Sequence, residues 1–234
     1  MKIIILAGGF GTRLRNVVPD VPKPMANISG TPFLEIVIQK LLKNGLTDII
    51  FSLHYKPNII VDYFSSSKYK SNNFEFLIEK KPLGTGGAIK NVINNKLISD
   101  DESFMVLNGD TYVEFSFKNM IIKHKNENAK LTMLLRKNTN SKRYGIVNVD
   151  DEKVISYNEK SNSEEGFINA GVYIMKSSVF KNYKLNKCFS LEKDFLEPYI
   201  SKINANYFIS KDYFIDIGIK EDYLKAQKEL VFTG

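Results

Sequence analysis

The sequence has little of several residue types that carry common structural or chemical roles. Among its 234 residues it has no tryptophan, two histidines and a single cysteine, Cys188. One cysteine excludes an intramolecular disulfide and a cysteine-rich metal site. The apolar run Ile3–Ala7 is shorter than a signal-peptide core of about 7–15 residues and far below the roughly 18 residues that span a membrane. We therefore expect a cytoplasmic protein that has no membrane partner.

Basic charge is in excess, but it is not concentrated. The chain has 33 Lys+Arg against 26 Asp+Glu, which gives a net charge of +7 and a pI near 9.2. Such an excess is typical of proteins with an anionic partner, such as nucleic acid or a phosphorylated substrate. A compositional bias would also produce this excess. An AT-rich coding sequence favours Lys over Arg together with Asn, Ile, Tyr and Phe, and these residue types are abundant here. The basic residues are scattered and form no long block, so we expect no nucleic-acid partner.

The first half of the sequence alternates predicted strands with predicted helices. Apolar runs that end at glycine or polar residues indicate buried strands, and proline and glycine mark the helix ends. The predicted strands are 2–6, 48–53, 74–78 and 103–107, and the predicted helices are 31–44, 58–64 and 86–94. This order predicts a mostly parallel sheet with right-handed crossovers.

The second half changes character. Its predicted strands are 131–135, 145–149, 154–157 and 172–175, and its predicted helices are 190–199 and 220–230. Strands that follow one another without a helix between them favour antiparallel or mixed pairing. We predict one α/β domain over residues 1–234, with a Rossmann-like, mostly parallel or mixed sheet flanked by helices and a small substrate-side β lobe. In such sheets, ligands bind at the carboxyl ends of the strands.

A glycine-rich segment, residues 6–14, follows the first predicted strand. Gly8, Gly9 and Gly11 allow the backbone to approach a ligand and to point N–H groups at anionic oxygens. Arg13 adds a charge suited to paired phosphate contacts. The spacing matches neither the dinucleotide-binding motif nor the Walker A loop. The alternative interpretation is a tight turn that binds nothing.

Three further residues carry charge close to predicted strand ends or stiff turns. Proline on both sides of Lys23 restricts the backbone and fixes where the ammonium points. Asp110 ends the turn 108–110 after the fourth strand, and Asp216 follows a similar apolar run. Carboxylates beside a phosphate loop suit magnesium, a hard cation that binds oxygen. The alternatives are a solvated lysine and ordinary Asn-Gly-Asp turn chemistry.

Together these segments resemble the signature of the sugar-1-phosphate nucleotidyltransferases. The matching motifs follow in the family's order along nearly the whole chain: 8–14 with 22–24, 82–88, 108–110, 144–145, 159–160, 169–171 and 216–218. The resemblance implies the nucleotide-diphospho-sugar transferase fold. It also implies that residues 1–115 bind the nucleotide, that residues 116–234 bind the sugar phosphate, and that a homodimer is possible.

The resemblance also implies substrates, a metal and residue roles. The substrates would be a nucleoside triphosphate and a sugar 1-phosphate, with magnesium as the cofactor. The nucleotide-binding residues would be Leu6, Ala7, Gly8, Gly9, Gly11, Thr12, Arg13, Lys23, Glu79, Pro82, Gly84, Thr85, Asn108 and Gly109. The sugar-phosphate-binding residues would be Tyr144, Gly145, Glu159, Lys160, Asn169 and Gly171. The catalytic residues would be Arg13, Lys23 and Asp110, and the ligands of one or two metal ions would be Asp110 and Asp216.

The implied chemistry needs charge neutralisation and alignment rather than a general base. A phosphate monoester is already ionised at pH 7, so it attacks the α-phosphorus without losing a proton. Neither His54 nor His124 is then catalytic, and we expect His124, in a lysine-rich helix, to be solvated. The charged pair Glu159 and Lys160 has an alternative interpretation as exposed side chains that stabilise little.

The choice of base and sugar stays open. Glu79 stands where many family members have Gln, and a carboxylate can accept from both N1–H and the 2-amino group of guanine. GTP is therefore favoured, unless Glu79 points into solvent. Residues 79–89, 143–150 and 212–218 most resemble the D-glycero-α-D-manno-heptose 1-phosphate guanylyltransferases, which would place the protein in capsule or surface polysaccharide biosynthesis.

Two alternatives to that activity are considered. One is a transferase that acts on glucose, mannose or N-acetylmuramate 1-phosphate with UTP, CTP or dTTP. The other is a regulator that binds a nucleotide sugar without turnover. The presence of Arg13, Lys23, Asp110 and Asp216 argues against the regulator, because binding alone has less need of two metal-binding carboxylates.

Overall fold

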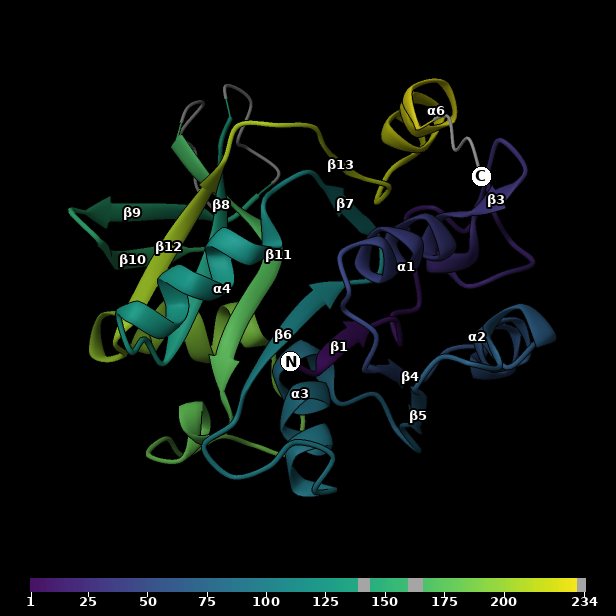
Figure 1. The fold of residues 1–234 in the computed structure, drawn as a ribbon. Helices are drawn as coiled ribbons and strands as arrows, with labels where there is room; N and C mark the ends of the chain where they lie inside the picture. Colours follow the sequence, from purple (N-terminus) through teal and green to yellow (C-terminus); the bar gives the residue numbers. More distant parts are fainter. Residues whose placement is uncertain (139–143, 160–165, 231–234) are drawn as a thin grey trace. The chain divides into compact units, whose positions relative to one another are not determined.

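The computed structural model describes residues 1–138, 144–159 and 166–230 (Figure 1). The chain forms two compact units. The first contains Met1–Pro82, Asn108–Tyr112 and the segment from Tyr213 onward, and the second contains Leu83–Leu107 and Val113–Asp212. Among the described residues, no helix is long and apolar enough to cross a membrane.

The first unit contains a parallel sheet in the order β5-β4-β1. Its elements are β1 (Ile3–Leu6), a 3-10 helix (Lys23–Met25), β2 (Asn27–Ile28), β3 (Thr31–Pro32), α1 (Phe33–Lys43), β4 (Ile49–Leu53), α2 (Pro57–Phe64), a second 3-10 helix (Ser67–Tyr69), β5 (Phe74–Ile78), β13 (Phe214–Asp216) and α6 (Lys220–Glu229). Burial along almost all of β1 and β4 explains their unbroken apolar runs, since parallel strands are covered on both faces. The three strands and three helices predicted for this unit are confirmed to within a residue or two.

Segments from late in the chain complete this unit. β13 pairs with β7 (Thr111–Val113), whose first two residues belong to the first unit. In α6, the Tyr223 hydroxyl donates to the Asn27 carbonyl at 2.8 Å. The two units therefore do not coincide with consecutive halves on either side of residue 115, because the chain returns to the first unit at Tyr213.

The second unit contains a mixed sheet in the order β6-β11-β8-β12-β10-β9. Its elements are α3 (Gly84–Asn94), β6 (Ser103–Asn108, the last residue of which belongs to the first unit), α4 (Phe117–Asn126), β8 (Leu131–Asn138), β9 (Ile146–Asp150), β10 (Lys153–Asn158), β11 (Gly166–Lys176), a 3-10 helix (Ser177–Phe180), a π-helix (Leu191–Leu196), α5 (Glu197–Tyr199), a 3-10 helix (Ile200–Lys202) and β12 (Ala205–Ser210). β11 is antiparallel to β6 and β8, whereas β12 is parallel to β8. The mixed pairing predicted for the second half is confirmed, and β12 is a strand that the sequence analysis missed.

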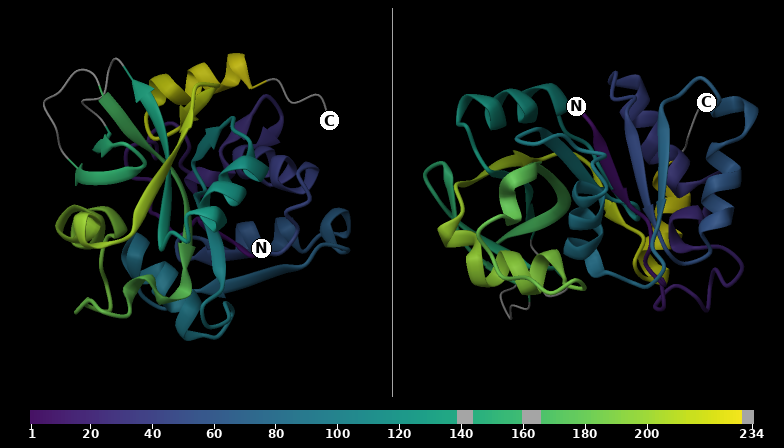
Figure 2. Two further views of the ribbon diagram at one scale, coloured as in Figure 1. Left: turned by 60° about the vertical axis from the view of Figure 1, so that its left-hand side comes forward. Right: turned by 90° about the horizontal axis from the view of Figure 1, so that it is seen from below.

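His124 is not solvated, so that prediction is wrong. The helix α4 packs against β8 and β12 (Figures 1 and 2). His124 lies one helical turn after the buried Met120 and is 1% exposed, while Lys125 beside it is exposed. The His124 ring nitrogens lie 2.8 Å from the Thr132 hydroxyl and 3.1 Å from the Ser103 hydroxyl. The lysines that dominate the local sequence lie on the outer face of the helix. Their abundance led to the prediction of a solvated histidine, although one face of the helix is buried.

Burial of His124 predicts a pH-dependent stability. Burial, with smaller contributions from Lys176 and Lys125, lowers the pKa of His124 to about 4, whereas the unfolded chain titrates near 6.5. The unfolded state therefore binds more protons between these values, and stability falls as the pH decreases from about 6.5 to 4. We expect about 2–3 kcal/mol of unfolding free energy to be lost. Urea unfolding at several pH values measures this loss. His124→Gln should have a flatter profile, and equal slopes would contradict the assignment.

Candidate functional site

The glycine-rich segment leaves β1 and folds closely against two other parts of the first unit. A Cβ added to Gly8 would lie 3.0 Å from the backbone nitrogen of His54. Gly11 has a φ of +59°, and a Cβ there would lie 2.9 Å from the Cβ of Lys23. Space around Gly9 is open. Thr12 and Arg13, further along the same segment, are exposed. Two of these glycines are thus required by packing, while the backbone at Gly9 is accessible to a ligand.

Lys23 lies at the centre of a group of charges in the first unit. Its ammonium forms an ion pair with the carboxylate of Asp110. Burial acts to lower the pKa of Lys23, but Asp110 and Asp216 outweigh both burial and the opposing charge of Arg13, so the pKa is raised. The lysine therefore carries its positive charge at neutral pH. The structure brings together the four charged residues that the sequence analysis assigned to phosphate and metal binding in this unit.

Backbone hydrogen bonds hold the two aspartates side by side. The Gly109 amide donates to the Leu6 carbonyl at 2.9 Å, and a Cβ on Gly109 would lie 3.0 Å from that oxygen. The Ile217 amide donates to the Asp110 carbonyl at 3.1 Å. A Cβ on Gly218 would lie 2.9 Å from a carboxylate oxygen of Asp216. A side chain at position 109 or 218 would displace these atoms, so both glycines help to position the carboxylates of Asp110 and Asp216.

This donor set fits a magnesium ion. Two carboxylates offer hard oxygen ligands, and Mg²⁺ commonly takes one or two of them together with water and substrate phosphates. Within the described ranges no group of three or more His, Cys, Asp and Glu side chains forms a metal cluster. A self-sufficient protein cage for a metal is thus absent from that part of the chain, whereas Asp110 and Asp216 can share an ion with phosphate oxygens.

Glu79 does not point into solvent. It is 8% exposed, and the Ser52 hydroxyl donates to one of its carboxylate oxygens at 3.0 Å. The Nδ1 atom of His54 lies 2.9 Å from the Glu79 carbonyl oxygen. The side chain is thus fixed beside the end of β4, which removes the solvated alternative without identifying a base.

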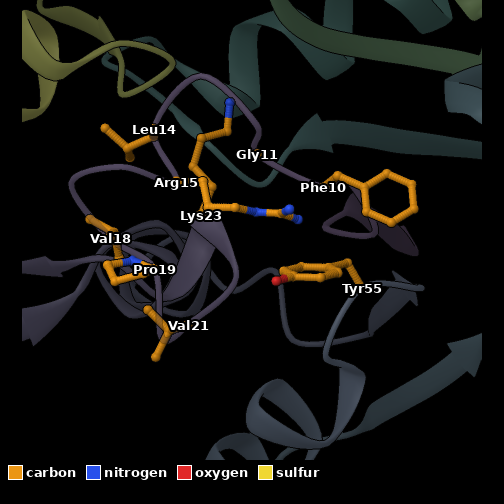
Figure 3. A pocket seen from close by; sticks show the side chains of 9 residues that line it. All are labelled: Phe10, Gly11, Leu14, Arg15, Val18, Pro19, Val21, Lys23 and Tyr55. Atoms are coloured by element: carbon orange, nitrogen blue, oxygen red, sulfur yellow. The ribbon is translucent and has the colours of Figure 1, made fainter.

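A pocket beside the glycine-rich segment contains residues that the sequence analysis missed. Nine residues line it: Phe10, Gly11, Leu14, Arg15, Val18, Pro19, Val21, Lys23 and Tyr55 (Figure 3). The guanidinium carbon of Arg15 lies 5.1 Å from the centre of the Tyr55 ring, and Figure 3 shows the Lys23 ammonium directed away from that ring. No sequence signal marks Tyr55, because it follows β4 and lies far from the segment along the chain.

In the second unit, the glycines at the start of α3 pack against the backbone near Phe189. The amides of Gly86 and Gly87 both donate to the Phe189 carbonyl at 3.1 Å. Gly84 has a φ of +74°, and a Cβ there would lie 2.5 Å from the same carbonyl oxygen. The motif 82–88 therefore has a structural role that its resemblance to a nucleotide loop did not predict. Packing alone accounts for three of its glycines.

A network of hydroxyl groups surrounds Glu192, a residue that the sequence analysis did not select. Its carboxylate accepts from Thr85 at 2.7 Å, from Ser190 at 2.9 Å and from Tyr173 at 3.3 Å. The Asn169 amide donates to the Tyr173 hydroxyl at 2.6 Å. Two residues predicted to bind different substrates, Thr85 and Asn169, are thus linked inside one unit.

Glu159 lies in the same region as this network. It accepts from the Tyr157 hydroxyl, and Tyr157 also fills the space beside Gly145, where no Cβ could fit. Burial raises the pKa of Glu159, and the nearby Glu192 adds to this effect more than Lys193 offsets it. Glu159 is therefore a half-buried hydrogen-bonded acceptor, not a fully exposed surface charge.

Comparison with known proteins identifies the family. A family model described as nucleotidyl transferase matches residues 2–231. The chain belongs to the nucleotidyl transferase family. It is 43% identical over 230 residues to the D-glycero-alpha-D-manno-heptose 1-phosphate guanylyltransferase of Aneurinibacillus thermoaerophilus, with 98% of each chain covered. It is 40% identical over 224 residues to the protein of the same name from Campylobacter jejuni, with 95% of this chain and 97% of the relative covered.

A solved structure agrees with this family. HddC from Yersinia pseudotuberculosis has a TM-score of 0.86 at 40% identity, with 98% of this chain and 99% of that chain covered. A second crystal structure of HddC is a complex with GMP-PN, and its TM-score is 0.84. The predicted α/β fold and the predicted nucleotidyltransferase family are both confirmed.

The site residues predicted for this nucleotidyltransferase fall into both units. The first unit holds Leu6, Ala7, Gly8, Gly9, Gly11, Thr12, Arg13, Lys23, Glu79, Pro82, Asn108, Gly109, Asp110 and Asp216. The second holds Gly84, Thr85, Tyr144, Gly145, Glu159, Asn169 and Gly171. Lys160 lies outside the described residues. Chemically, the first unit offers positive charge suited to phosphates and carboxylates suited to a divalent cation. The second offers hydroxyl, amide and carboxylate groups suited to a polyhydroxylated ligand.

Proposed function

We propose that this nucleotidyltransferase transfers GMP from GTP to D-glycero-α-D-manno-heptose 1-phosphate. A phosphate oxygen of the sugar would attack the α-phosphorus in line, and the bond to the β-phosphate oxygen would break to release pyrophosphate. The other product would be the GDP-sugar. The observation that carries the proposal is the likeness, along almost the whole chain, to relatives bearing that enzyme name. The HddC complex with GMP-PN, a guanine nucleotide analogue, supports the choice of base.

The residues of the first unit supply the charge that this reaction needs. Two polyanions must approach each other, and their repulsion is the main barrier to be lowered. Lys23 would contact the α-phosphate, while Arg13 and the backbone at Gly9 and Gly11 would bind the β- and γ-phosphates. Magnesium, which we propose is held by Asp110 and Asp216, would supply further neutralisation of the phosphate oxygens.

The residues of the second unit would bind the sugar. Glu159 and Asn169 supply acceptors and donors for its hydroxyl groups, and Tyr157 and Tyr173 hold these two side chains in place. We also propose that the reaction occurs in the cytoplasm and feeds capsule or surface polysaccharide synthesis, since a nucleotide-activated sugar is a donor for glycosyl transfer. A homodimer stays a prediction of the family resemblance.

A substrate panel tests this function. Pyrophosphate release would be measured with GTP, UTP, CTP, ATP and dTTP, each combined with heptose, mannose, glucose and N-acetylmuramate 1-phosphates. Preference for GTP with the heptose phosphate supports the proposal. Preference for another pair would establish one of the alternative transferases. Binding of a nucleotide sugar without release from any pair would establish the regulator instead.

Glu79 is expected to contribute to the preference for guanine. A carboxylate can accept two adjacent donors, and guanine presents N1–H and the 2-amino group, whereas uracil presents one donor between two acceptors. In Glu79→Gln, kcat/KM for GTP should fall by about tenfold or more, which is the order of one lost charged hydrogen bond. The value for UTP should change much less. An equal change for both nucleotides, measured side by side, would exclude this role.

A further inference from the structure

The glycine-rich segment continues beyond residue 14, so that residues 7–20 form one loop between β1 and the 3-10 helix Lys23–Met25, and the shape of this loop depends on contacts from elsewhere in the first unit. Its internal backbone hydrogen bonds are local turns: the Leu14 amide donates to the Gly11 carbonyl at 3.0 Å, and the amides of Val17 and Val18 donate to the Leu14 carbonyl at 2.9 and 3.0 Å. Thr12, Arg13 and Asn16 are exposed. Such short-range bonds do not define one conformation over so long a loop, so outside contacts must fix it.

One such contact is an ammonium bound to two carbonyls near the end of this loop. Lys56 donates from Nζ to the Asp20 carbonyl at 2.7 Å and to the Pro19 carbonyl at 3.1 Å. Lys56 itself has a φ of +45° and precedes the first residue of α2. A non-glycine residue in that region is uncommon. The backbone therefore holds an unfavourable conformation at the residue whose side chain reaches the loop.

The preceding residue, Tyr55, contacts the start and the middle of the same loop. Its amide donates to the Gly8 carbonyl at 3.3 Å. Its ring lies 5.6 Å from the Phe10 ring and 5.1 Å from the Arg15 guanidinium carbon. Figure 3 shows the guanidinium spread over the face of the Tyr55 ring, the arrangement of a cation–π contact.

We propose that Tyr55 and Lys56 are positioning residues that hold the glycine-rich segment in the conformation that binds the triphosphate. They fix the loop of residues 7–20 near Gly8, at Arg15 and at residues 19–20, and Gly11 and Arg13 lie between the first two of these points. Lys23 follows the third. Neither residue needs to touch the nucleotide. The inference rests on the proposed function only in assigning a triphosphate to this segment.

Substitution of Lys56 separates this role from a general effect on folding. Lys56→Met keeps most of the side-chain length but removes the donors, whereas Lys56→Arg keeps donors and charge. With Lys56→Met we expect KM for GTP to rise by about tenfold and kcat to change less than about threefold, because a loosened loop must be ordered on binding. Lys56→Arg should recover most of the affinity. Lys70→Met, at an exposed lysine of the same unit, is the matched control and should behave as wild type.

A second measurement does not depend on turnover. An arginine-specific protease cuts after Arg13 and Arg15 when the segment is released, and the fragments can be followed by mass spectrometry. Without nucleotide, Lys56→Met and Tyr55→Leu should be cut at these sites about tenfold faster than wild type, and Lys56→Arg should not. Cutting and GTP affinity like those of wild type would overturn the inference. If the variants are cut faster but the wild-type protein releases no pyrophosphate, Tyr55 and Lys56 still position the loop, and the proposed function is refuted.

Discussion

Replacing Lys23 with alanine is expected to lower kcat by about 10³-fold, which is the scale for removing one group that stabilises transition-state charge. Asp110 and Asp216 keep the Lys23 ammonium charged and hold it near the end of β1. In the reaction, negative charge grows around the α-phosphorus as the attacking oxygen approaches. An ammonium that is already in place needs no reorganisation at that moment, so its effect should appear in kcat more than in KM.

The fold should survive this substitution, so the loss of activity can be attributed to chemistry. The Lys23 side chain is 15% exposed and its partner Asp110 is 25% exposed, so the remaining carboxylate can be hydrated. Urea unfolding should place the variant within about 1–2 kcal/mol of wild type. Lys70→Ala is a control for the loss of one lysine elsewhere in the same unit. If Lys23→Ala kept more than about a tenth of the wild-type kcat, the proposed contact with the α-phosphate would be refuted.

Asp110→Ala is expected to abolish measurable turnover, and Asp110→Asn should keep only a small residual activity that can still be titrated. The carboxylate has two functions in the proposed site, because it holds the Lys23 ammonium and is one of two ligands available to magnesium. Asparagine keeps the shape and one oxygen but loses the charge that a divalent cation requires. We expect kcat to fall by at least about 10³-fold.

Magnesium titration distinguishes the two functions of Asp110. The concentration of magnesium that gives half-maximal activity should rise steeply in Asp110→Asn, and a comparison with Lys23→Ala shows how much of the loss comes from the lysine alone. Asp62→Asn, at an exposed aspartate of α2, is the matched control. A fully active Asp110→Ala protein would remove the basis for a metal at this position.

Much of the first unit follows from local sequence, and the reason is its parallel sheet. Strands buried on both faces are continuous apolar runs, and each such run is visible without knowledge of its neighbours. The carboxyl ends of parallel strands lie at one edge of a sheet. Residues that follow β1 are therefore expected close to residues that follow the other parallel strands. Asp110 is predicted on that basis, whereas Lys23 is predicted from the two prolines that flank it just after the glycine-rich segment. The ion pair between the two side chains shows how close these segments come.

The features that sequence reasoning missed depend on distant partners. His124 is buried because α4 packs on β8 and β12. It continues the stripe of Phe117 and Met120 at positions i, i+3 and i+7, but the lysines around it led to the prediction of a solvated residue. The role of Glu192 depends on its hydrogen bond with Thr85, which is 107 positions away. The role of Tyr55 depends on its contact with the guanidinium of Arg15. Periodicity describes each element singly, whereas these roles arise from pairs of elements that are far apart along the chain.

The first unit is assembled from three separate stretches of chain, and this has a consequence for its biogenesis. During synthesis Lys23 leaves the ribosome before Asp110, and Asp110 leaves it before Asp216. The charge group cannot form until the segment from Tyr213 has been made. The second unit ends at Asp212, so it can fold before β13 has been made. Until then the first unit contains Arg13 and Lys23 but lacks Asp216. Folding of the catalytic part is therefore a late event, and its long-range pairings should make it slower than folding of a unit built from local contacts.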